Sequence, residues 1–458
     1  VIRNPQFYFQ PSISWSKVSS SSIAFRFYPK GFIFADAGMS LFSNKDLLEL
    51  AAYCNSCVCS RLIKFLSPTM NYEAGQISQL PYKTLPINNQ NTLEISEDNI
   101  SISKSDWDAH ETSWDFQRNE LLSIDTSTYT ENIDYKIEKH FEETGKHISI
   151  SPAAPKLGSL EWRMEQYKTK WERKFMQLHK NEEELNRQFI DIYGLQDELT
   201  PDVPLNEITV LQQGEISIEN DRIKWHDDVV MKQFISYAVG CMMGRYSIDK
   251  PGLILANQGD GVNEYNEKVP NSRFEVDDDG IIPLMTSDTE FADNATKRFK
   301  QWLAIAFGDT HLVENLNFIE GALGKSLDDY FVKDFWKDHK KMYQNRPIYW
   351  LFASKKGAFQ CIAYMHRMNA YTAERIRAKY LLPYIETLQA RITDLDARRS
   401  ELTTRETKQL QQLTKTLEEC QEYHERLQVV AEQAIAFDLD DGVVVNYAKF
   451  GDVLQKIK

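Results

Sequence analysis

The feature that most constrains the fold of this chain is a long apolar stripe between residues 160 and 193. Apolar side chains recur there every three or four residues, and Gly194 follows the last of them. This spacing is typical of an amphipathic α-helix, and glycine commonly ends such a helix. We therefore predict one helix, about 50 Å long, that packs against a partner through the stripe. The stripe comprises Leu160, Met164, Tyr167, Trp171, Phe175, Leu178, Leu185, Phe189 and Tyr193.

A second stripe, with coiled-coil spacing, lies near the C-terminus in residues 373–436. A polar stretch at 396–407 divides it into two arms, whose other positions are rich in Glu, Arg, Lys and Gln. This pattern predicts an antiparallel coiled-coil hairpin. The first arm carries Ile385, Leu388, Ile392 and Leu395, and the second carries Leu410, Leu413, Leu417, Cys420, Leu427 and Ala431.

The opening segment has a β pattern instead. Aromatic and polar residues alternate within residues 12–42, and a Pro-Lys-Gly break falls at 29–31. We predict two strands joined by a turn, followed by a helix from about 45 to 66, where apolar residues recur at helical spacing. The apolar strand residues are Ile23, Phe25, Phe27, Phe32 and Phe34.

The rest of the chain mixes element types. Residues 87–157 are polar and weakly periodic, so we interpret them as a connector with short elements. Helices are predicted at 228–245 and around 331–343, and a strand at 346–354. Together these features predict an α+β, multi-domain fold, in which a mixed β unit is followed by a mainly helical region. The expected domain ranges are 1–86, 87–157, 158–245, 246–370, 371–437 and 438–458.

Length and composition set further bounds. The 458 residues suffice for about two to four domains, and no apolar run reaches the roughly 18 residues of a membrane helix. Six cysteines without a secretory signal favour reduced thiols and a cytoplasmic location. Because the sequence begins with valine and not methionine, we expect it to be the C-terminal part of a larger protein.

Charge is distributed unevenly along the chain. The net charge of −14 argues at first against a nucleic-acid partner. However, residues 1–86 carry eight basic and four acidic groups, and residues 332–383 carry eleven basic and three acidic groups. This asymmetry favours one side of the molecule that faces DNA and another that faces solvent.

The two basic regions supply the candidate DNA contacts. In residues 333–367, cationic groups that neutralise phosphates alternate with aromatic rings that can lie against bases. The alternative is a partly buried unit whose lysines only keep it soluble, and for the N-terminal residues an ordinary surface. The candidates are Lys17, Arg26, Lys30, Arg61 and Lys64 in the first region and Lys340, Lys341, Arg346, Lys355, Lys356 and Arg367 in the second. The interleaved rings are Trp336, Tyr343, Tyr349, Trp350 and Phe352.

Two short motifs are weak candidates for metal binding. Cys54, Cys57 and Cys59 lack the second ligand pair of a zinc site, so we interpret them as small apolar side chains. Asp277–Asp279, followed by Gly280, lacks the alternating ligands of a calcium loop and is predicted to be a solvated acidic turn. We predict no metal ligands in this chain.

No catalytic or cofactor motif is found in the sequence. The segment Asn4–Phe7 has Gln6 where an Asn-Pro-Pro-aromatic methyltransferase loop has its second proline. Neither a glycine-rich nucleotide loop nor a nuclease or hydrolase motif is present. We therefore predict that this chain alone is catalytically inactive and binds no cofactor.

Residues 12–42 with Pro68–Pro81 resemble the junction and target-recognition segment of large adenine-specific DNA methyltransferases. Five further segments, in order, resemble the PglX family, the adenine-specific methyltransferases of BREX phage defence. These segments are Asn181–Pro201, Ile235–Leu253, Asp277–Leu284, Arg346–Arg367 and Asp438–Leu454. The resemblance implies that residues 1–86 begin a target-recognition domain. It also implies that S-adenosylmethionine binds in an N-terminal half absent from this chain.

The resemblance also implies a set of partners and a role. The partners would be double-stranded DNA, the chain's own N-terminal methyltransferase domain, other BREX proteins and phage-encoded DNA-mimic inhibitors, with no membrane. The role would be target recognition for adenine-N6 methylation that marks self DNA. The alternative is an assembly platform that binds other defence proteins and not DNA, which the net acidity favours.

Overall fold

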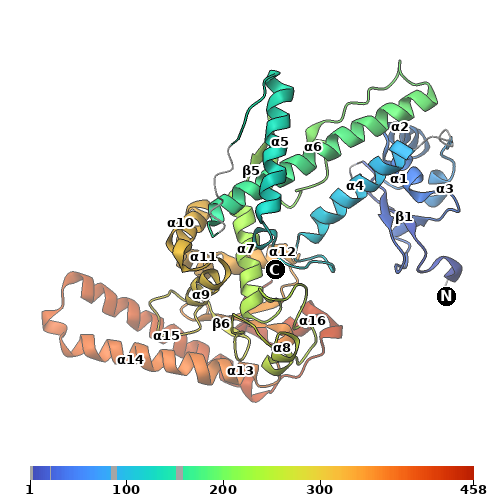
Figure 1. The fold of residues 1–458 in the computed structure, drawn as a ribbon. Helices are drawn as coiled ribbons and strands as arrows, with labels where there is room; N and C mark the ends of the chain where they lie inside the picture. Colours follow the sequence, from blue (N-terminus) through green and yellow to red (C-terminus); the bar gives the residue numbers. More distant parts are fainter. Residues whose placement is uncertain (1–3, 21, 84–89, 151–157, 458) are drawn as a thin grey trace. The chain divides into compact units, whose positions relative to one another are not determined.

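The computed structural model describes residues 4–20, 22–83, 90–150 and 158–457, and Figure 1 shows the arrangement of their helices and strands. The chain divides into two compact units. The first comprises Val1–Trp107, Asp134–Lys139 and Lys168–Trp225, and the second comprises Asp108–Ile133, His140–Tyr167 and His226–Lys458. Helices dominate and the sheets are small and antiparallel, so the predicted mixed α+β, multi-domain fold is confirmed.

The first unit contains a three-stranded antiparallel sheet. Strand β1 (Ser12–Ser16) lies between β2 (Arg26–Tyr28) and β3 (Gly38–Leu41). The alternating sequence of β1 buries Ile13 and Trp15 on one face, which places this strand over the core.

Of the two strands predicted within residues 23–34, the first corresponds to β2, whereas the second, around Phe32 and Phe34, is wrong. Residues 32–34 form no strand, and the consecutive side chains of Phe32 and Ile33 are both exposed. A strand with one buried face would bury one of the two. Instead, the carbonyl of Phe32 accepts a hydrogen bond from the backbone N–H of Phe9, at 2.9 Å.

The helix predicted from about 45 to 66 is two helices, α1 (Leu47–Asn55) and α2 (Cys57–Leu66). Ser56 separates them with an extended backbone, and its hydroxyl accepts the Cys59 N–H at 3.2 Å as the cap of α2. The Asn55 side chain accepts a hydrogen bond from the backbone N–H of Phe25 and donates one to the Phe25 carbonyl. A short helix, α3 (Ala74–Ile77), follows.

The interpretation of 87–157 as a connector with short elements is also wrong, and its residues 87–89 and 151–157 lie outside the described ranges. The stretch contains two helices of 19 residues each, α4 (Gln90–Asp108) and α5 (Thr126–Thr144). Polar contacts replace the missing apolar stripe of α4: the Asn181 amide donates to Asp98 and Asn99, both at 2.8 Å. Tertiary contacts therefore override weak periodicity here.

The long helix predicted from the apolar stripe is confirmed. Helix α6 (Leu160–Tyr193) has 34 residues and buries every stripe position except Tyr193. It contributes residues to both units. The first unit ends with a hairpin of β4 (Ile216–Glu219) and β5 (Arg222–Trp225).

The second unit is built around α7 (Asp227–Met242), which confirms the helix predicted at 228–245 and is buried along most of its length. Its antiparallel sheet has the order β6 (Ile281–Pro283), β8 (Gln360–Tyr364) and β7 (Tyr349–Ala353). The strand predicted at 346–354 thus corresponds to β7. The other helices are α8 (Val262–Lys268), α9 (Ala295–Phe307), α10 (Leu312–Leu323), α11 (Leu327–Lys333) and α12 (Phe335–Met342).

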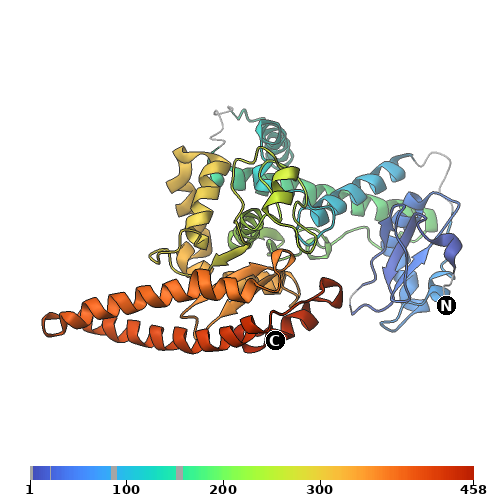
Figure 2. The ribbon, with the colours of Figure 1, turned by 90° about the horizontal axis from the view of Figure 1, so that it is seen from below.

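The C-terminal part of the second unit contains two long helices that lie side by side in Figures 1 and 2, α14 (Leu382–Ala397) and α15 (Thr404–Glu432). Of the predicted seam, Leu388, Leu395 and Leu427 are buried, whereas Leu410 and Leu413 are half-buried. Coiled-coil geometry of this pair stays a prediction. Short helices α13 (Thr372–Arg375) and α16 (Val443–Ala448) flank it. Within the described ranges, no helix has both the length and the apolar character needed to cross a membrane.

Candidate nucleic-acid interface

The N-terminal basic candidates all lie in the first unit, but they differ in how far their charge is engaged. Lys17 follows β1, and its ammonium nitrogen lies 3.2 Å from a Glu73 carboxylate oxygen and 3.6 Å from an Asp36 oxygen. The hydrogen bond with Glu73 and the charge of Asp36 raise the pKa of Lys17. The charge of Lys17 is therefore already paired with two carboxylates of the protein.

The other four N-terminal candidates are exposed. Arg26 lies on β2 and Lys30 in the turn that follows it. Arg61 and Lys64 lie on one face of α2, where the Arg61 guanidinium sits 5.9 Å from the centre of the Phe65 ring. These side chains can reach a phosphate without first breaking a buried contact.

In the second unit, the basic residues of 333–367 do not form one group. Lys340, Lys341 and Arg346 precede β7, whereas Lys355 and Lys356 lie in the turn after it. A strand of five residues spans about 17 Å, so the two groups lie at opposite ends of β7. The Lys340 ammonium sits 5.2 Å from the centre of the Trp336 ring. The side chains of Lys341, Arg346, Lys355 and Lys356 are exposed.

The turn after β7 is held by an acidic residue of α15. One carboxylate oxygen of Glu419 accepts the Ser354 hydroxyl and the Lys356 N–H, both at 2.6 Å. Burial alone would raise the pKa of Glu419, but these hydrogen bonds lower it overall. Glu419 therefore fixes the backbone that presents Lys355 and Lys356.

Arg367 is not an exposed cation, and its assignment as a DNA contact is wrong for this structure. Only 7% of the residue is exposed. Its guanidinium donates to the backbone carbonyl of Asp277 at 2.7 Å and of Asp278 at 3.0 Å. A phosphate could reach this group only if the loop that it binds were displaced.

The aromatic rings predicted to face bases are core residues instead. Trp336, Tyr349, Trp350 and Phe352 are buried. The Trp336 indole N–H donates to the carbonyl of Tyr349 at 3.1 Å, which ties α12 to β7. For these rings, the alternative of a partly buried unit is the one that the structure supports.

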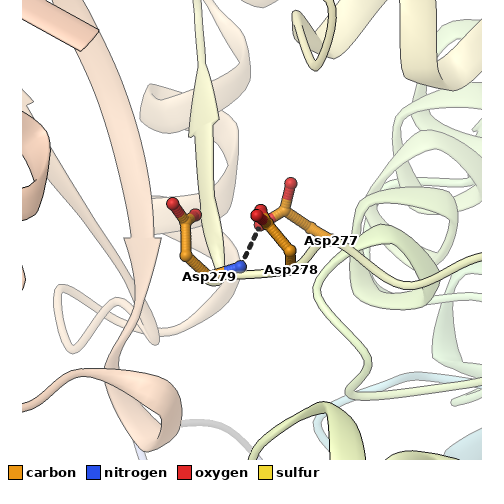
Figure 3. Close-up of side chains that lie close together, drawn as sticks. All are labelled: Asp277, Asp278 and Asp279. Atoms are coloured by element: carbon orange, nitrogen blue, oxygen red, sulfur yellow. Dashed lines mark hydrogen bonds between the residues drawn. The ribbon is translucent and has the colours of Figure 1, made fainter. Parts of the chain in front are cut away.

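Of the three acidic residues Asp277–Asp279, Asp278 is exposed as the predicted solvated turn requires, whereas Asp277 is buried and Asp279 is half-buried (Figure 3). Asp277 is 4% exposed, and one of its carboxylate oxygens accepts the N–H groups of Asp279, Gly280 and Ile281 at 2.7–3.2 Å. Burial, together with repulsion from Asp279 and Asp293, raises the pKa of Asp277 to about 7. A sequence of three acidic residues gave no signal of this burial.

This loop brings three carboxylates close enough to share a cation, with ligand oxygens within 4.8 Å of one another. The chain's own Lys379 already binds two of the three: its ammonium lies 2.9 Å from an Asp278 oxygen and 2.7 Å from an Asp279 oxygen. Although burial opposes it, these contacts with Lys379 lower the pKa of Asp278. The arrangement is that of an ion-paired structural turn, and it gives no separate support for a metal.

A buried polar network that sequence reasoning missed surrounds Glu111. Glu111 accepts hydrogen bonds from the Ser236 hydroxyl at 2.5 Å and the Tyr343 hydroxyl at 3.3 Å. Burial raises the pKa of Glu111. Arg245 lies among the tyrosines of the same core and donates to the Tyr364 hydroxyl at 3.2 Å. These residues are far apart in sequence, so no local motif could have identified the network.

The three clustered cysteines contribute to the core of the first unit, as the sequence interpretation expected. Cys54 and Cys59 are buried and Cys57 is half-buried. A hydrogen bond with the Cys54 thiol and burial raise the pKa of Cys59. Burial of Cys54 and Cys59 in this core is what the interpretation as small apolar side chains predicts.

Comparisons with known proteins identify the relatives of this chain. It is 34% identical over 485 aligned residues to the adenine-specific methyltransferase BrxX of Escherichia coli O9:H4 (strain HS), an alignment that covers 100% of this chain and 37% of that protein. This chain is homologous to adenine-specific methyltransferases. It is also 38% identical over 464 residues to the adenine-specific methyltransferase PglX of Lacticaseibacillus casei (strain Zhang), covering 97% of this chain and 35% of that protein.

The homology to BrxX and PglX confirms the resemblance inferred from the sequence. The chain spans little more than a third of the length of these methyltransferases. Since the BrxX alignment covers the whole chain, both compact units lie within the shared region. No family model matches the chain.

Proposed function

We propose that this chain is the DNA target-recognition region of a site-specific adenine-N6 DNA methyltransferase of BREX phage defence, which marks self DNA. The homology to BrxX and PglX over nearly the whole chain is the observation that carries this proposal. The S-adenosylmethionine-binding half lies, in this proposal, in the part of the enzyme outside this chain.

The physics of base methylation favours such a division of labour. An enzyme that methylates an adenine must first flip the base out of the stack, which costs a few kcal/mol. A separate surface must hold the duplex by its phosphates and read base edges in a groove. Catalysis and reading therefore need different kinds of surface on one protein.

The charge distribution supports a DNA contact in the first unit. Residues 1–83 have eight basic and four acidic groups, a balance of +4. Because the whole chain has a net charge of −14, the remaining residues carry −18. Arg26, Lys30, Arg61 and Lys64 are exposed within this positive segment, and we assign phosphate contacts to them.

The acidity of the remainder supports the second candidate, an assembly platform for other defence proteins. Exposed acidic residues on α15 include Glu418, Glu422 and Glu425. Such a surface suits a basic protein partner better than DNA. This candidate and DNA recognition assign different surfaces of the chain and can both hold.

A DNA-binding titration at several salt concentrations tests the proposal. Duplex affinity should fall with salt, and Arg26→Ala/Lys30→Ala should reduce the salt slope by about 2, one per lost phosphate contact. The matched control is Lys224→Ala/Arg398→Ala, which removes two basic groups paired with Glu219 and Asp394. An unaltered chain with no salt-dependent affinity for duplex DNA would refute DNA recognition and leave assembly as the function.

A further inference from the structure

The first unit exposes a group of apolar side chains beside these basic residues. Phe9 is 60% exposed, Phe32 is 50% exposed and Ile33 is 66% exposed. Their backbones are neighbours, because the N–H of Phe9 donates to the carbonyl of Phe32 and Ile33 follows Phe32 in the chain. We call these three residues the apolar turn. Large apolar side chains exposed on neighbouring backbone segments are candidates for a binding surface.

The apolar turn is held in place by its own backbone and by a ring behind it. The Phe9 N–H donates to Phe32 at 2.9 Å, and the Gly31 N–H donates back to the carbonyl of Phe9 at 3.2 Å. The Tyr28 ring packs edge-on against Phe32, with 5.1 Å between ring centres. Gly31 has a φ of 110°, which L side chains rarely adopt. The exposed side chains are thus preorganised.

The surroundings of the apolar turn are positively charged. Arg26 and Lys30 are exposed on the strand and turn that carry Phe32. Within residues 1–45 the sequence has five basic residues and a single acidic one, Asp36. Asp36 itself lies within 3.6 Å of the Lys17 ammonium. A polyanion therefore complements the charge of this segment.

We propose that the apolar turn inserts into the DNA base stack at the recognised site, while Arg26 and Lys30 bind the flanking phosphates. Exposed Phe and Ile side chains are the residues that proteins use as wedges between base steps. Opening the stack would also lower the cost of flipping an adenine, which methylation requires. This inference rests on the proposed function, and it assigns the apolar turn a task that basic residues cannot perform.

The test uses the 458-residue chain and a short duplex enriched by that chain from a random-sequence pool. Ile33→Ser alone and Phe32→Ala/Ile33→Ser should each weaken affinity, the double variant about tenfold, as loss of base stacking does. The salt slope should stay unchanged, because no phosphate contact is lost. Trp114→Ala/Val313→Ser is the control, since both residues are exposed apolar residues of the second unit, 97% and 71% exposed.

A second readout reports directly on the base stack. Each adenine of the enriched duplex is replaced in turn by 2-aminopurine, whose fluorescence rises when the base is unstacked. The unaltered chain should raise the signal at one or two neighbouring positions, and the double variant should abolish the rise. Circular dichroism melting tests whether both variants are folded. Ile33→Ser is expected to fold, because the side chain that it changes is 66% exposed.

The outcomes separate this inference from the proposed function. If the unaltered chain binds DNA but neither variant changes affinity or fluorescence, the apolar turn is not a wedge and DNA recognition still stands. If the unaltered chain self-associates in sedimentation and the variants lose only that, the apolar turn is a protein interface. A chain that binds no duplex at any salt concentration refutes both.

Discussion

At the scale of single residues, burial separates the basic side chains into those that stabilise the fold and those that are exposed. Arg367 belongs to the first group. Its guanidinium bonds backbone carbonyls of the loop that contains Asp277 and Asp278. Its bonds to the carbonyls of Asp277 and Met243 are buried, where an unpaired acceptor costs about 1–3 kcal/mol. Arg367 therefore stabilises the fold, whereas the side chain of Lys356 is exposed.

Arg367→Met should accordingly lower the free energy of unfolding by about 2–4 kcal/mol, because it leaves buried carbonyls without donors. Lys356→Met, at an exposed position, should change it by less than about 0.5 kcal/mol. Denaturant titration followed by circular dichroism measures both. Equal stability of the two variants would contradict the role assigned to Arg367.

Asp277 gives a prediction about pH. Burial and two neighbouring carboxylates raise its pKa in the folded chain from an ordinary 3.8 to about 7. In this range the folded chain holds a proton that the unfolded chain has released, so the contribution of Asp277 to stability is present at low pH and is lost as the pH rises through 7.

The variant Asp277→Asn removes this ionisation and keeps an oxygen acceptor for the loop N–H groups. The free energy of unfolding of the unaltered chain should fall, relative to the variant, between about pH 4 and pH 8. Denaturant titrations at several pH values measure the difference. Parallel pH curves for the two proteins would show that Asp277 does not titrate in this range.

At the scale of elements, strong apolar periodicity predicted structure well and weak periodicity did not. Helix α6 was predicted because its buried positions follow the helical repeat, whereas α7 was predicted from a nearly continuous apolar stretch that is buried all round. Helix α4 was missed, because buried polar side chains such as Thr92 and Ser96 contact α6 or their own backbone in place of an apolar stripe. Hydrogen bonds between helices depend on which helices pack together, and the sequence of one segment does not determine this packing.

The candidate site was predictable from the sequence only where local composition, and not tertiary packing, decides whether a side chain is exposed. Local charge excess identified Arg26, Lys30, Arg61 and Lys64, which are exposed in the structure. It failed for Arg367, because burial of a long side chain depends on tertiary packing. Phe32 and Phe34 were assigned to a strand by their alternation, so the exposure of Phe32 next to a turn was not foreseen.

The helices α14 and α15 give a stability prediction at this scale. Leu388 is 2% exposed in α14, and Val429 is 57% exposed in α15. Leu388→Ala should destabilise the second unit by about 2–4 kcal/mol through a lost apolar contact and a cavity, whereas Val429→Ala should cost less than about 0.5 kcal/mol. Thermal unfolding measures both. DNA affinity should survive in folded Leu388→Ala, and its loss would mean that these helices belong to the reading surface.

At the scale of the whole molecule, the two units differ in charge and in what they offer to a partner. The first opens with a basic segment that carries the apolar turn, and the second contains the acidic α15. Since the chain spans little more than a third of BrxX and PglX, chemistry and recognition can reside in different parts of such an enzyme.

This division predicts that the chain alone does not bind S-adenosylmethionine. The sequence has no Asn-Pro-Pro-aromatic loop and no glycine-rich strand-turn-helix motif. Isothermal titration calorimetry with S-adenosylmethionine should therefore show no saturable heat for this chain, while the full-length enzyme serves as the positive control. Saturable binding at micromolar concentration would place the cofactor site within these residues.

The contact between Gly280 and Arg367 has a consequence for how this sequence can change over evolution. Gly280 has a φ of 72°, and a Cβ atom placed there would lie 3.1 Å from the Arg367 side chain. Any substitution at position 280 therefore meets backbone strain and a tight contact, which the Arg367 side chain could relieve only by moving a few tenths of an ångström. Position 280 should therefore remain glycine over evolution. The positive φ favours glycine even in a lineage that has lost the arginine, and the close contact adds to this constraint wherever the arginine is kept.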